Sequence, residues 1–261
     1  MNHMKETTST SDYREPHEGR GHNTEVRFTF VRHSQKLDGS VVDKDLSGLS
    51  LATISPGGVK RAEKFGGEVL AGRKISKAYA TKVYRTSQTL ESAACAAGLD
   101  ATEFNKLLRV EGRDPAYFAM PEGLRSPNFI KQYEEKMAGP RTEHIATHFP
   151  GKKFVDLTPD EQEDVAEYAN EFAVDWWLSF GDQRPDEGTL SPREMAAEVA
   201  YKLNRLINLG AFMPNNEKVD LISCGHKTST EAFLKYALER TADGETVVGF
   251  EGDWWQFKNF R

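Results

Sequence analysis

The sequence has few cysteines and no long apolar run, and each shortage excludes a class of protein. Only Cys95 and Cys224 are cysteines among the 261 residues, which is too few for the disulfide framework of a small secreted protein. No run of about 18 apolar residues occurs, so we expect no membrane-spanning helix. The first 24 residues lack the apolar segment of a secretory signal. We therefore expect a globular, cytoplasmic protein without a membrane partner.

Basic residues are fewer than acidic residues. The chain has 34 Lys and Arg residues against 40 Asp and Glu, a formal net charge of −6. Proteins that bind nucleic acid through a broad cationic face are normally basic, so no nucleic-acid partner is expected. Hydrophobic residues make up 38% of the chain, enough for a sizeable core in one large domain or two modest ones.

The chain divides into a polar N-terminal segment and a longer patterned region. Residues 1–24 contain almost no apolar side chain and predict a flexible tail, with the folded domain over 25–261. The tail histidines have no regular spacing, so they form only a weak metal-binding motif. These are His3, His17 and His22.

Strands and helices alternate along the patterned region. Apolar, β-branched runs predict strands at 26–31, 75–80 and 219–223. Helical spacing predicts helices after Ser55, over 85–97 and over 226–238. Near the C-terminus, 246–250 and 254–257 have the pattern of a hairpin. This alternation predicts a three-layer α/β/α fold with a mostly parallel central sheet.

The block at about 115–187 is aromatic and acidic and contains no clear strand. Thr158 to Glu161 has the form of a capped helix start. A stripe of apolar residues from Val165 to Phe180 then predicts a long amphipathic helix, whose apolar face is better explained by core packing than by a ligand. Ser191 to Glu194 is a second capping signal.

Two histidines and two arginines follow the predicted strands. His33, preceded by Arg32, comes after the first strand, and His226 comes after the last. Arg85 follows the second strand at the start of a helix, where backbone N–H groups favour anions. Because ligands of open α/β sheets bind at the carboxyl ends of the strands, we expect these side chains to share one pocket.

These residues resemble a known family. Arg32-His33, Ser55-Pro56-Gly57-Gly58 with Arg61-Ala62-Glu63, the segment around Arg85, and Gly225-His226 occur in the order and approximate spacing of the histidine phosphatase superfamily, which includes the cofactor-dependent phosphoglycerate mutases. The resemblance covers roughly residues 25–112 and 188–258. In its light, the block at 115–187 lies where the family has a substrate-specificity cap.

The resemblance implies a phosphohistidine mechanism. His33 would attack phosphorus as a neutral imidazole. Arg32 and Arg85 would bind the phosphoryl oxygens. His226 would add a further donor to the phosphoryl group, as an imidazolium. No metal ion or other cofactor is expected, because these cations would supply the positive charge.

The general acid is less well defined. The family places a carboxylate shortly after the strand that follows the Arg85 helix. Glu111 is the nearest match, one position later than the common pattern, and Asp114 is the alternative. A plain solvated loop charge at Glu111 stays open as well.

The chain also departs from the family pattern. Ser34 stands where most members have Gly, and Lys227 follows the second histidine; both are candidate substrate-binding residues, as is Lys36. Together with Lys82, these lysines predict either a substrate with a second negative group, such as a bisphosphate or a phosphorylated acid, or ordinary surface lysines.

Absent motifs narrow the expected activity. The Trp-Asn, Gly-Trp and Glu-Arg-His-Tyr strings of the mutases do not occur, nor do those of the acid phosphatases. We therefore expect a phosphomonoesterase acting on a small anionic phosphate ester. A mutase-type phosphotransferase and a non-catalytic phospho-ligand-binding relative remain the alternatives, and the sequence leaves the oligomeric state open.

One further motif falls inside the insertion. His144 and His148 have the i, i+4 spacing of a zinc site. The glutamate precedes the first histidine instead of following it, so a structural or surface role is favoured.

Overall fold

The computed structural model describes residues 20–34, 53–111, 119, 126–237, 239–242 and 245–248. Of the sequence-based site predictions, Lys36 and Asp114 lie outside these residues.

The centre of the molecule is a parallel four-stranded sheet. Its strands are β1 (Glu25–Arg32), β4 (Lys218–Gly225), β2 (Ile75–Ala80) and β3 (Leu108–Val110), in the spatial order β1-β4-β2-β3. β1 and β4 pair in parallel from Glu25 with Lys218 to Arg32 with Gly225. This register brings Arg32 and Gly225 side by side at the carboxyl end of the sheet.

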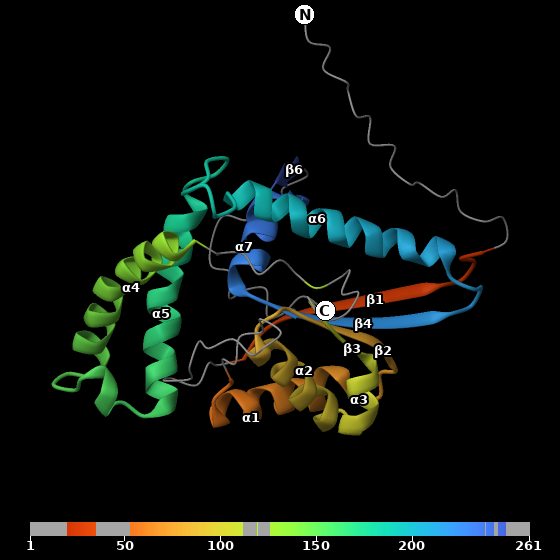
Figure 1. Ribbon diagram of the computed structural model, residues 1–261, viewed down its shortest axis with the longest axis horizontal. Coiled ribbons are helices and arrows are strands. Elements are labelled where there is room, and N and C mark those ends of the chain that lie inside the picture. The colour runs from red at the N-terminus through yellow and green to blue at the C-terminus, as the bar shows by residue number, and fades with distance from the viewer. Residues whose placement is uncertain are drawn as a thin grey trace, which may run out of the picture.

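Helices cover both faces of the sheet, which gives the expected three layers (Figure 1). One face carries α1 (Pro56–Phe65), α2 (Tyr84–Ala96) and α3 (Ala101–Leu107). The other carries α6 (Pro192–Leu209) and α7 (Lys227–Tyr236). The predicted α/β class, parallel sheet and helical insertion are confirmed.

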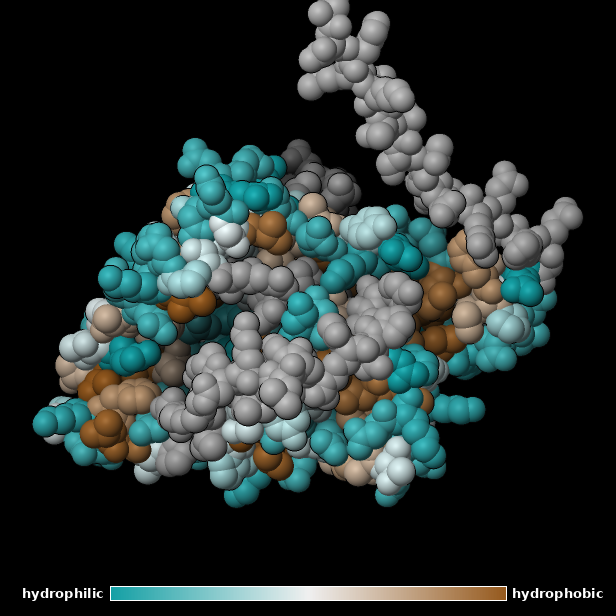
Figure 2. Space-filling view, viewed as in Figure 1, coloured by the Kyte–Doolittle hydropathy of each residue, from teal (hydrophilic) through white to brown (hydrophobic). Residues whose placement is uncertain are grey.

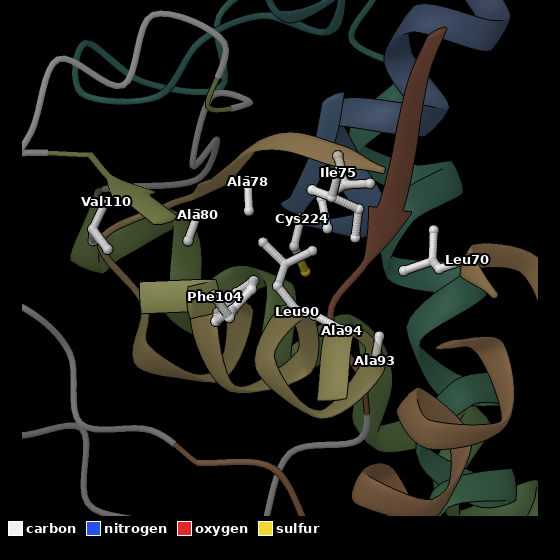
Figure 3. Close-up of a cluster of buried hydrophobic side chains, with 11 residues drawn as sticks. Leu70, Ile75, Ala78, Ala80, Leu90, Ala93, Ala94, Phe104, Val110 and Cys224 are labelled. Carbon is white, nitrogen blue, oxygen red and sulfur yellow. The ribbon is translucent and has the colours of Figure 1, made fainter. Parts of the chain in front are cut away.

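The main apolar cluster lies between the sheet and α2 (Figure 3). Leu90 of α2 and Phe104 of α3 are fully buried there, and burying one such side chain stabilises the fold by about 1.5–3 kcal/mol. Close packing requires small residues where α1 and α2 meet. Gly66, in the π-helical turn Gly66–Leu70, lies directly against the backbone of Ala93.

The insertion forms a pair of helices beside the carboxyl end of the sheet (Figure 1). α4 (Pro127–His148) and α5 (Pro159–Leu178) are joined by a short 3₁₀ turn, Phe154–Asp156. α5 begins with the expected capping box, because Glu161 N–H donates to Thr158 Oγ1 and Thr158 N–H donates to the Glu161 carboxylate. We call α4 and α5 the cap.

The predicted apolar stripe of α5 is largely buried. Val165, Ala169, Ala173 and Trp177 are fully buried. Trp177 packs in one cluster with Phe129 of α4 and Met195 of α6. Core packing therefore explains this face, as expected. Phe172 is an exception, with 46% of its surface exposed.

Residues 20–24, which the sequence pattern assigns to a flexible tail, are attached to the domain. Gly21 N–H donates to the Met213 carbonyl at 3.0 Å, and His22 N–H donates to Asn215 Oδ1 at 2.9 Å. Gly21 has a φ of 79°, a conformation that glycine adopts without strain. The attached part of the chain thus begins before β1. Amino-acid composition does not predict this attachment, because backbone N–H groups make the hydrogen bonds.

The C-terminal hairpin differs from the expected one. β6 (Glu245–Val248) overlaps the first predicted strand, but its antiparallel partner is β5 (Glu239–Ala242). The sequence places Asp-Gly between these strands, and this pair favours a tight hairpin turn. The other predicted strand, 254–257, lies outside the described residues.

Among the described residues on the face in Figure 2, hydrophilic side chains predominate and the apolar colour forms separate patches. Within the part of the chain that the structure describes, no helix has the length and apolarity that crossing a membrane requires.

Candidate active site

The four predicted phosphate-site residues line one cavity at the carboxyl end of the sheet. Arg32 is the last residue of β1 and His33 follows it, while His226 follows β4 and caps α7. Arg85 lies in the first turn of α2. All four side chains line the same cavity of about 730 Å³. The rings of His33 and His226 are 5.1 Å apart between centroids and meet edge to face at 62°.

His33 is held in one orientation and one tautomer. Its Nδ1 lies 2.8 Å from the backbone carbonyl oxygen of Ser34. A carbonyl oxygen only accepts hydrogen bonds, so Nδ1 carries the proton and Nε2 carries the lone pair. Burial, together with the positive charges of Arg85 and Arg32, holds the pKa of His33 well below its usual range. His33 is therefore a neutral imidazole at neutral pH.

The surroundings of His226 also favour a neutral imidazole. Burial and the nearby guanidiniums of Arg85 and Arg32 lower its pKa to about 3. Its Nε2 lies 3.2 Å from Thr81 Oγ1. Two guanidiniums already supply positive charge in this buried site, so a third cation there is unfavourable unless an anion lies beside it. The predicted imidazolium opposite a phosphoryl group stays a prediction. A neutral imidazole can still donate one hydrogen bond through a ring N–H.

The cavity wall is positively charged on balance. Its lining contains five Arg or Lys side chains and three glutamates, whereas the whole chain is acidic. This local excess of cations favours an anionic ligand. The core contributes Arg32, His33, Ser34, Arg61, Val83, Arg85, His226, Lys227 and Thr228, and the cap contributes Tyr133, Glu134, Met137, Arg141, Gln162, Glu163, Ala166, Glu167 and Asn170.

A cap carboxylate is ion-paired with the phosphate-site cations. Glu167 of α5 accepts hydrogen bonds from Arg32 Nη1 at 2.7 and 2.8 Å and from Lys227 Nζ at 3.0 Å. Burial alone would raise the pKa of Glu167, but the charges of Arg32 and Lys227 outweigh it and lower the pKa to about 2. Glu167 is therefore ionised and joins the cap to the core.

Lys227 lies near three acidic side chains. Besides Glu167, its Nζ lies 3.8 Å from both Glu171 Oε1 and Glu231 Oε1, and its side chain is only 10% exposed. Burial raises the pKa of Glu231 well above its usual range, although Lys227 and Arg32 oppose this. Lys227 does line the cavity, but much of its charge is already balanced. Its predicted role in substrate binding stays a prediction.

Ser34 and Lys82 differ in their placement. Ser34 lines the cavity, yet its hydroxyl donates to the Gly58 carbonyl at 2.7 Å, and its N–H donates to Thr89 Oγ1 at 2.9 Å. These bonds fix the loop after His33 against α1 and α2. Lys82 is half-buried, and the described residues that line the cavity do not include it.

Glu111 lies at the end of β3. Its N–H donates to the Ala80 carbonyl at 2.9 Å, which continues the pairing of β3 with β2. Its Oε2 is buried and makes no hydrogen bond within the described structure. The described cavity lining does not include Glu111, so its role as the general acid stays a prediction.

Of the histidines of the zinc-like motif, His144 is buried between the two cap helices and His148 is exposed. His144 Nε2 lies 2.8 Å from Asp164 Oδ2 of α5, and its ring is 4.3 Å from that of His148. Over the described ranges, no three His, Cys, Asp or Glu side chains come together as a metal site.

The cap contributes polar residues that were not predicted from the sequence. Glu163 forms an ion pair with Arg61 of α1, and Glu167 does so with Arg32, one helical turn later. Glu163, Glu167 and Glu171 recur at four-residue intervals beside the apolar stripe, and this spacing places them on one side of a helix. That periodicity could have identified the side of α5 that faces the core.

Comparison with known proteins gives similarity only among solved structures. No family model matches the chain, and no curated protein matches it. A candidate alpha-ribazole-5'-P phosphatase from Escherichia coli is 11% identical, with a TM-score of 0.39, over 80% of this chain and 77% of its own. Mycobacterial hydrolase 1 is 17% identical, with a TM-score of 0.39, over 79% of this chain and 78% of its own.

A third structure is a mycobacterial glucosyl-3-phosphoglycerate phosphatase. It is 15% identical, with a TM-score of 0.36, over 79% of this chain and 76% of its own. Likeness at this level carries no conclusion about activity, so the site is interpreted from the chain's own residues. The parallel sheet, the helical insertion, and His33 and His226 at the carboxyl ends of β1 and β4 are the features that the resemblance to the histidine phosphatase superfamily implies.

Proposed function

We propose that this chain is a metal-independent phosphomonoesterase that acts on a small-molecule phosphate ester through a phosphohistidine at His33. The observation that carries the proposal is the state of His33. It is neutral, its Nδ1–H is tied to the Ser34 carbonyl, and it shares a cavity with two guanidiniums. Nε2 is thereby available as a nucleophile.

The first step transfers the phosphoryl group to the enzyme. The Nε2 lone pair of His33 forms a bond to phosphorus while the bond from phosphorus to the ester oxygen breaks. The departing alkoxide takes a proton from the general acid, for which Glu111 and Asp114 are the predicted candidates. Arg32 and Arg85 balance the charge on the equatorial oxygens, and such positioning accounts for most of phosphoryl-transfer catalysis.

The second step returns the enzyme to its starting state. A water oxygen attacks phosphorus, the bond between phosphorus and Nε2 breaks, and His33 recovers its lone pair. The water proton passes to the carboxylate that acted as the acid, and inorganic phosphate leaves. A mutase would instead return the phosphoryl group to an alcohol, so phosphate release and transfer to an added alcohol distinguish the two.

A non-catalytic phospho-ligand-binding protein is the second candidate. It is favoured by Glu111, whose carboxylate is not part of the described cavity lining. Such a protein would bind phosphate through Arg32 and Arg85 but would release no phosphate from an ester.

Hydrolysis of p-nitrophenyl phosphate in the presence of EDTA tests the proposal. We expect wild-type turnover and its loss, by at least about 1,000-fold, in His33→Ala. His148→Ala is the matched control, because His148 is a cap histidine outside the described cavity lining, and it should keep wild-type activity. Equal activity of wild type and His33→Ala would reject the proposal, and absence of turnover with retained phosphate binding would favour the second candidate.

A further inference from the structure

One carboxylate oxygen of the cap is shared by two cations of the core. Glu167 Oε1 accepts from Arg32 Nη1 at 2.7 Å and from Lys227 Nζ at 3.0 Å. We propose that Lys227 is a positioning residue: when a phosphoryl group binds Arg32, Lys227 keeps the Glu167 carboxylate and so limits its competition for the guanidinium. The inference rests on the proposed function, in which Arg32 binds the phosphoryl group.

Glu167 and a phosphoryl group are competing anions. Both accept hydrogen bonds from a guanidinium, and two negative groups around one cation repel each other. In the structure Arg32 Nη1 already donates to both carboxylate oxygens of Glu167. A bound phosphoryl group must therefore either share Arg32 with Glu167 or replace Glu167 there. In both cases binding is easier if a second cation stabilises the carboxylate.

Lys227 is placed to be that second cation. Its side chain is only 10% exposed and that of Glu167 is 25% exposed, so solvent and salt screen the pair less than they would a surface pair. Lys227 is also the first residue of α7. The start of a helix carries partial positive charge, so a lysine there is unfavourable unless a carboxylate lies beside it. Glu167 removes that cost, which favours keeping the pair together.

The other acidic groups near Lys227 are weaker partners. Glu171 Oε1 and Glu231 Oε1 each lie 3.8 Å from Lys227 Nζ, beyond hydrogen-bond distance. The Glu231 side chain is fully buried, and burial raises its pKa to about 9, so this carboxyl is neutral near pH 7. Of the three acidic groups, Glu167 therefore interacts most strongly with the charge of Lys227.

The exchange leaves each anion with a cation. In the structure Arg32 and Lys227 share the carboxylate of Glu167. With a phosphoryl group bound, Arg32 and Arg85 would balance the ligand while Lys227 balances Glu167. Lys227 would thus strengthen phosphate binding without contacting the phosphoryl group. This differs from the direct role in substrate binding that the sequence predicts for it.

A double-variant cycle tests the inference on the full chain. Isothermal titration calorimetry measures the Kd of inorganic phosphate for wild type, Lys227→Met, Glu167→Gln and the double variant. We expect Lys227→Met alone to raise the Kd by about 10-fold, because Glu167 then competes fully for Arg32. In the Glu167→Gln background the same substitution should raise it by about threefold at most, the effect of losing one nearby charge.

Two other roles of Lys227 give different results. If Lys227 contacts phosphate directly, its replacement should raise the Kd equally in both backgrounds. If Lys227 and Glu167 only join the cap to the core, breaking their pair from either side should change the Kd in the same direction. We expect opposite directions, a higher Kd for Lys227→Met and a lower one for Glu167→Gln. Equal effects in both backgrounds, or the same direction for the two single variants, would overturn the inference.

Further variants exclude a general effect of the substitution. Lys227→Arg keeps the positive charge and should bind phosphate within about twofold of wild type. Lys152→Met is the matched control, because Lys152 also pairs with a glutamate of α5, Glu161 at 2.9 Å, but is not part of the described cavity lining. It should leave the Kd unchanged. If Lys227→Met does not fold, Lys227→Gln takes its place in the cycle and the same outcomes decide.

Phosphate binding keeps the inference separate from the proposed activity. If the cycle gives the expected pattern but no ester is hydrolysed, the proposed activity fails and the role of Lys227 stands. If esters are hydrolysed through His33 and Lys227→Met weakens phosphate binding equally in both backgrounds, the proposed function stands and the inference fails.

Discussion

Arg32, the residue directly before His33, is bound through Nη1 to both carboxylate oxygens of Glu167, at 2.7 and 2.8 Å. The two residues come from different parts of the fold, β1 and the cap helix α5. The guanidinium predicted to bind the phosphoryl group is thus also one of the groups that join the cap to the core. Binding of phosphate and the position of the cap are therefore expected to depend on each other.

Glu167→Gln should destabilise the protein in a pH-dependent manner. The folded-state pKa of Glu167, about 2, lies below the usual 4.5, so its contribution is present above pH 4.5 and is lost as the pH falls toward 2. Urea unfolding should show wild type more stable than Glu167→Gln by about 1–3 kcal/mol at pH 7. The gap should shrink below pH 4.5. A gap that is the same at pH 7 and pH 3 would contradict the assignment.

The same substitution should strengthen binding of inorganic phosphate. Glutamine removes the negative charge that balances Arg32 and Lys227 while keeping the size of the side chain. We expect the dissociation constant for phosphate to fall by about 3- to 10-fold, because Arg32 is then free to form a charged hydrogen bond with the anion. Isothermal titration calorimetry of both proteins provides the measurement. Glu171→Gln, farther from Lys227 at 3.8 Å, is the control and should change the constant less.

His33 and His226 should remain neutral well below pH 6.5. Burial and the two arginines lower the pKa of both rings, whereas histidines of the unfolded chain titrate near 6.5. The unfolded state then binds more protons, so these two residues make the protein less stable as the pH falls below about 6.5. Nitrogen-15 shifts of the two rings, followed from pH 8 to 5, should stay at neutral-imidazole values. Protonation of either ring near pH 6.5 would refute this.

Gly66→Ala should destabilise the core, whereas Gly67→Ala should not. A Cβ on Gly66 would collide with the backbone carbonyl of Ala93 on α2, while a Cβ on Gly67 meets no atom within 4 Å. We expect a loss of about 1–3 kcal/mol for Gly66→Ala and no loss for its neighbour, since alanine is the better helix former. Chemical unfolding of the two variants makes the comparison. Equal stability would show that the backbones of Gly66 and Ala93 are not in close contact.

The sequence predicted best what is encoded by local pattern. The apolar runs located β1, β2 and β4, and the serine and threonine caps located the starts of α5 and α6. His33 and His226 each follow a predicted strand. Because parallel strands end at the same edge of a sheet, the fold class predicted that the two histidines lie close together, and the register of β1 and β4 agrees.

The rest depends on contacts between elements distant in sequence. That Glu167 would pair with Arg32, or that Arg141 would face the cavity, requires the orientation of the cap on the core, which periodicity alone does not give. The protonation of His226 depends on such contacts too, because its pKa reflects burial beside Arg85 and Arg32. No single segment of the sequence contains that environment.

Trapping the covalent intermediate tests the central claim most directly. Wild type mixed with a phosphate ester and quenched in alkali, where phosphohistidine survives, should gain the mass of one phosphoryl group on the peptide that contains His33. His33→Gln should gain none, and His148→Gln should be labelled as wild type. Labelling at another residue, or hydrolysis of the ester without any labelled peptide under single-turnover conditions, would contradict the account.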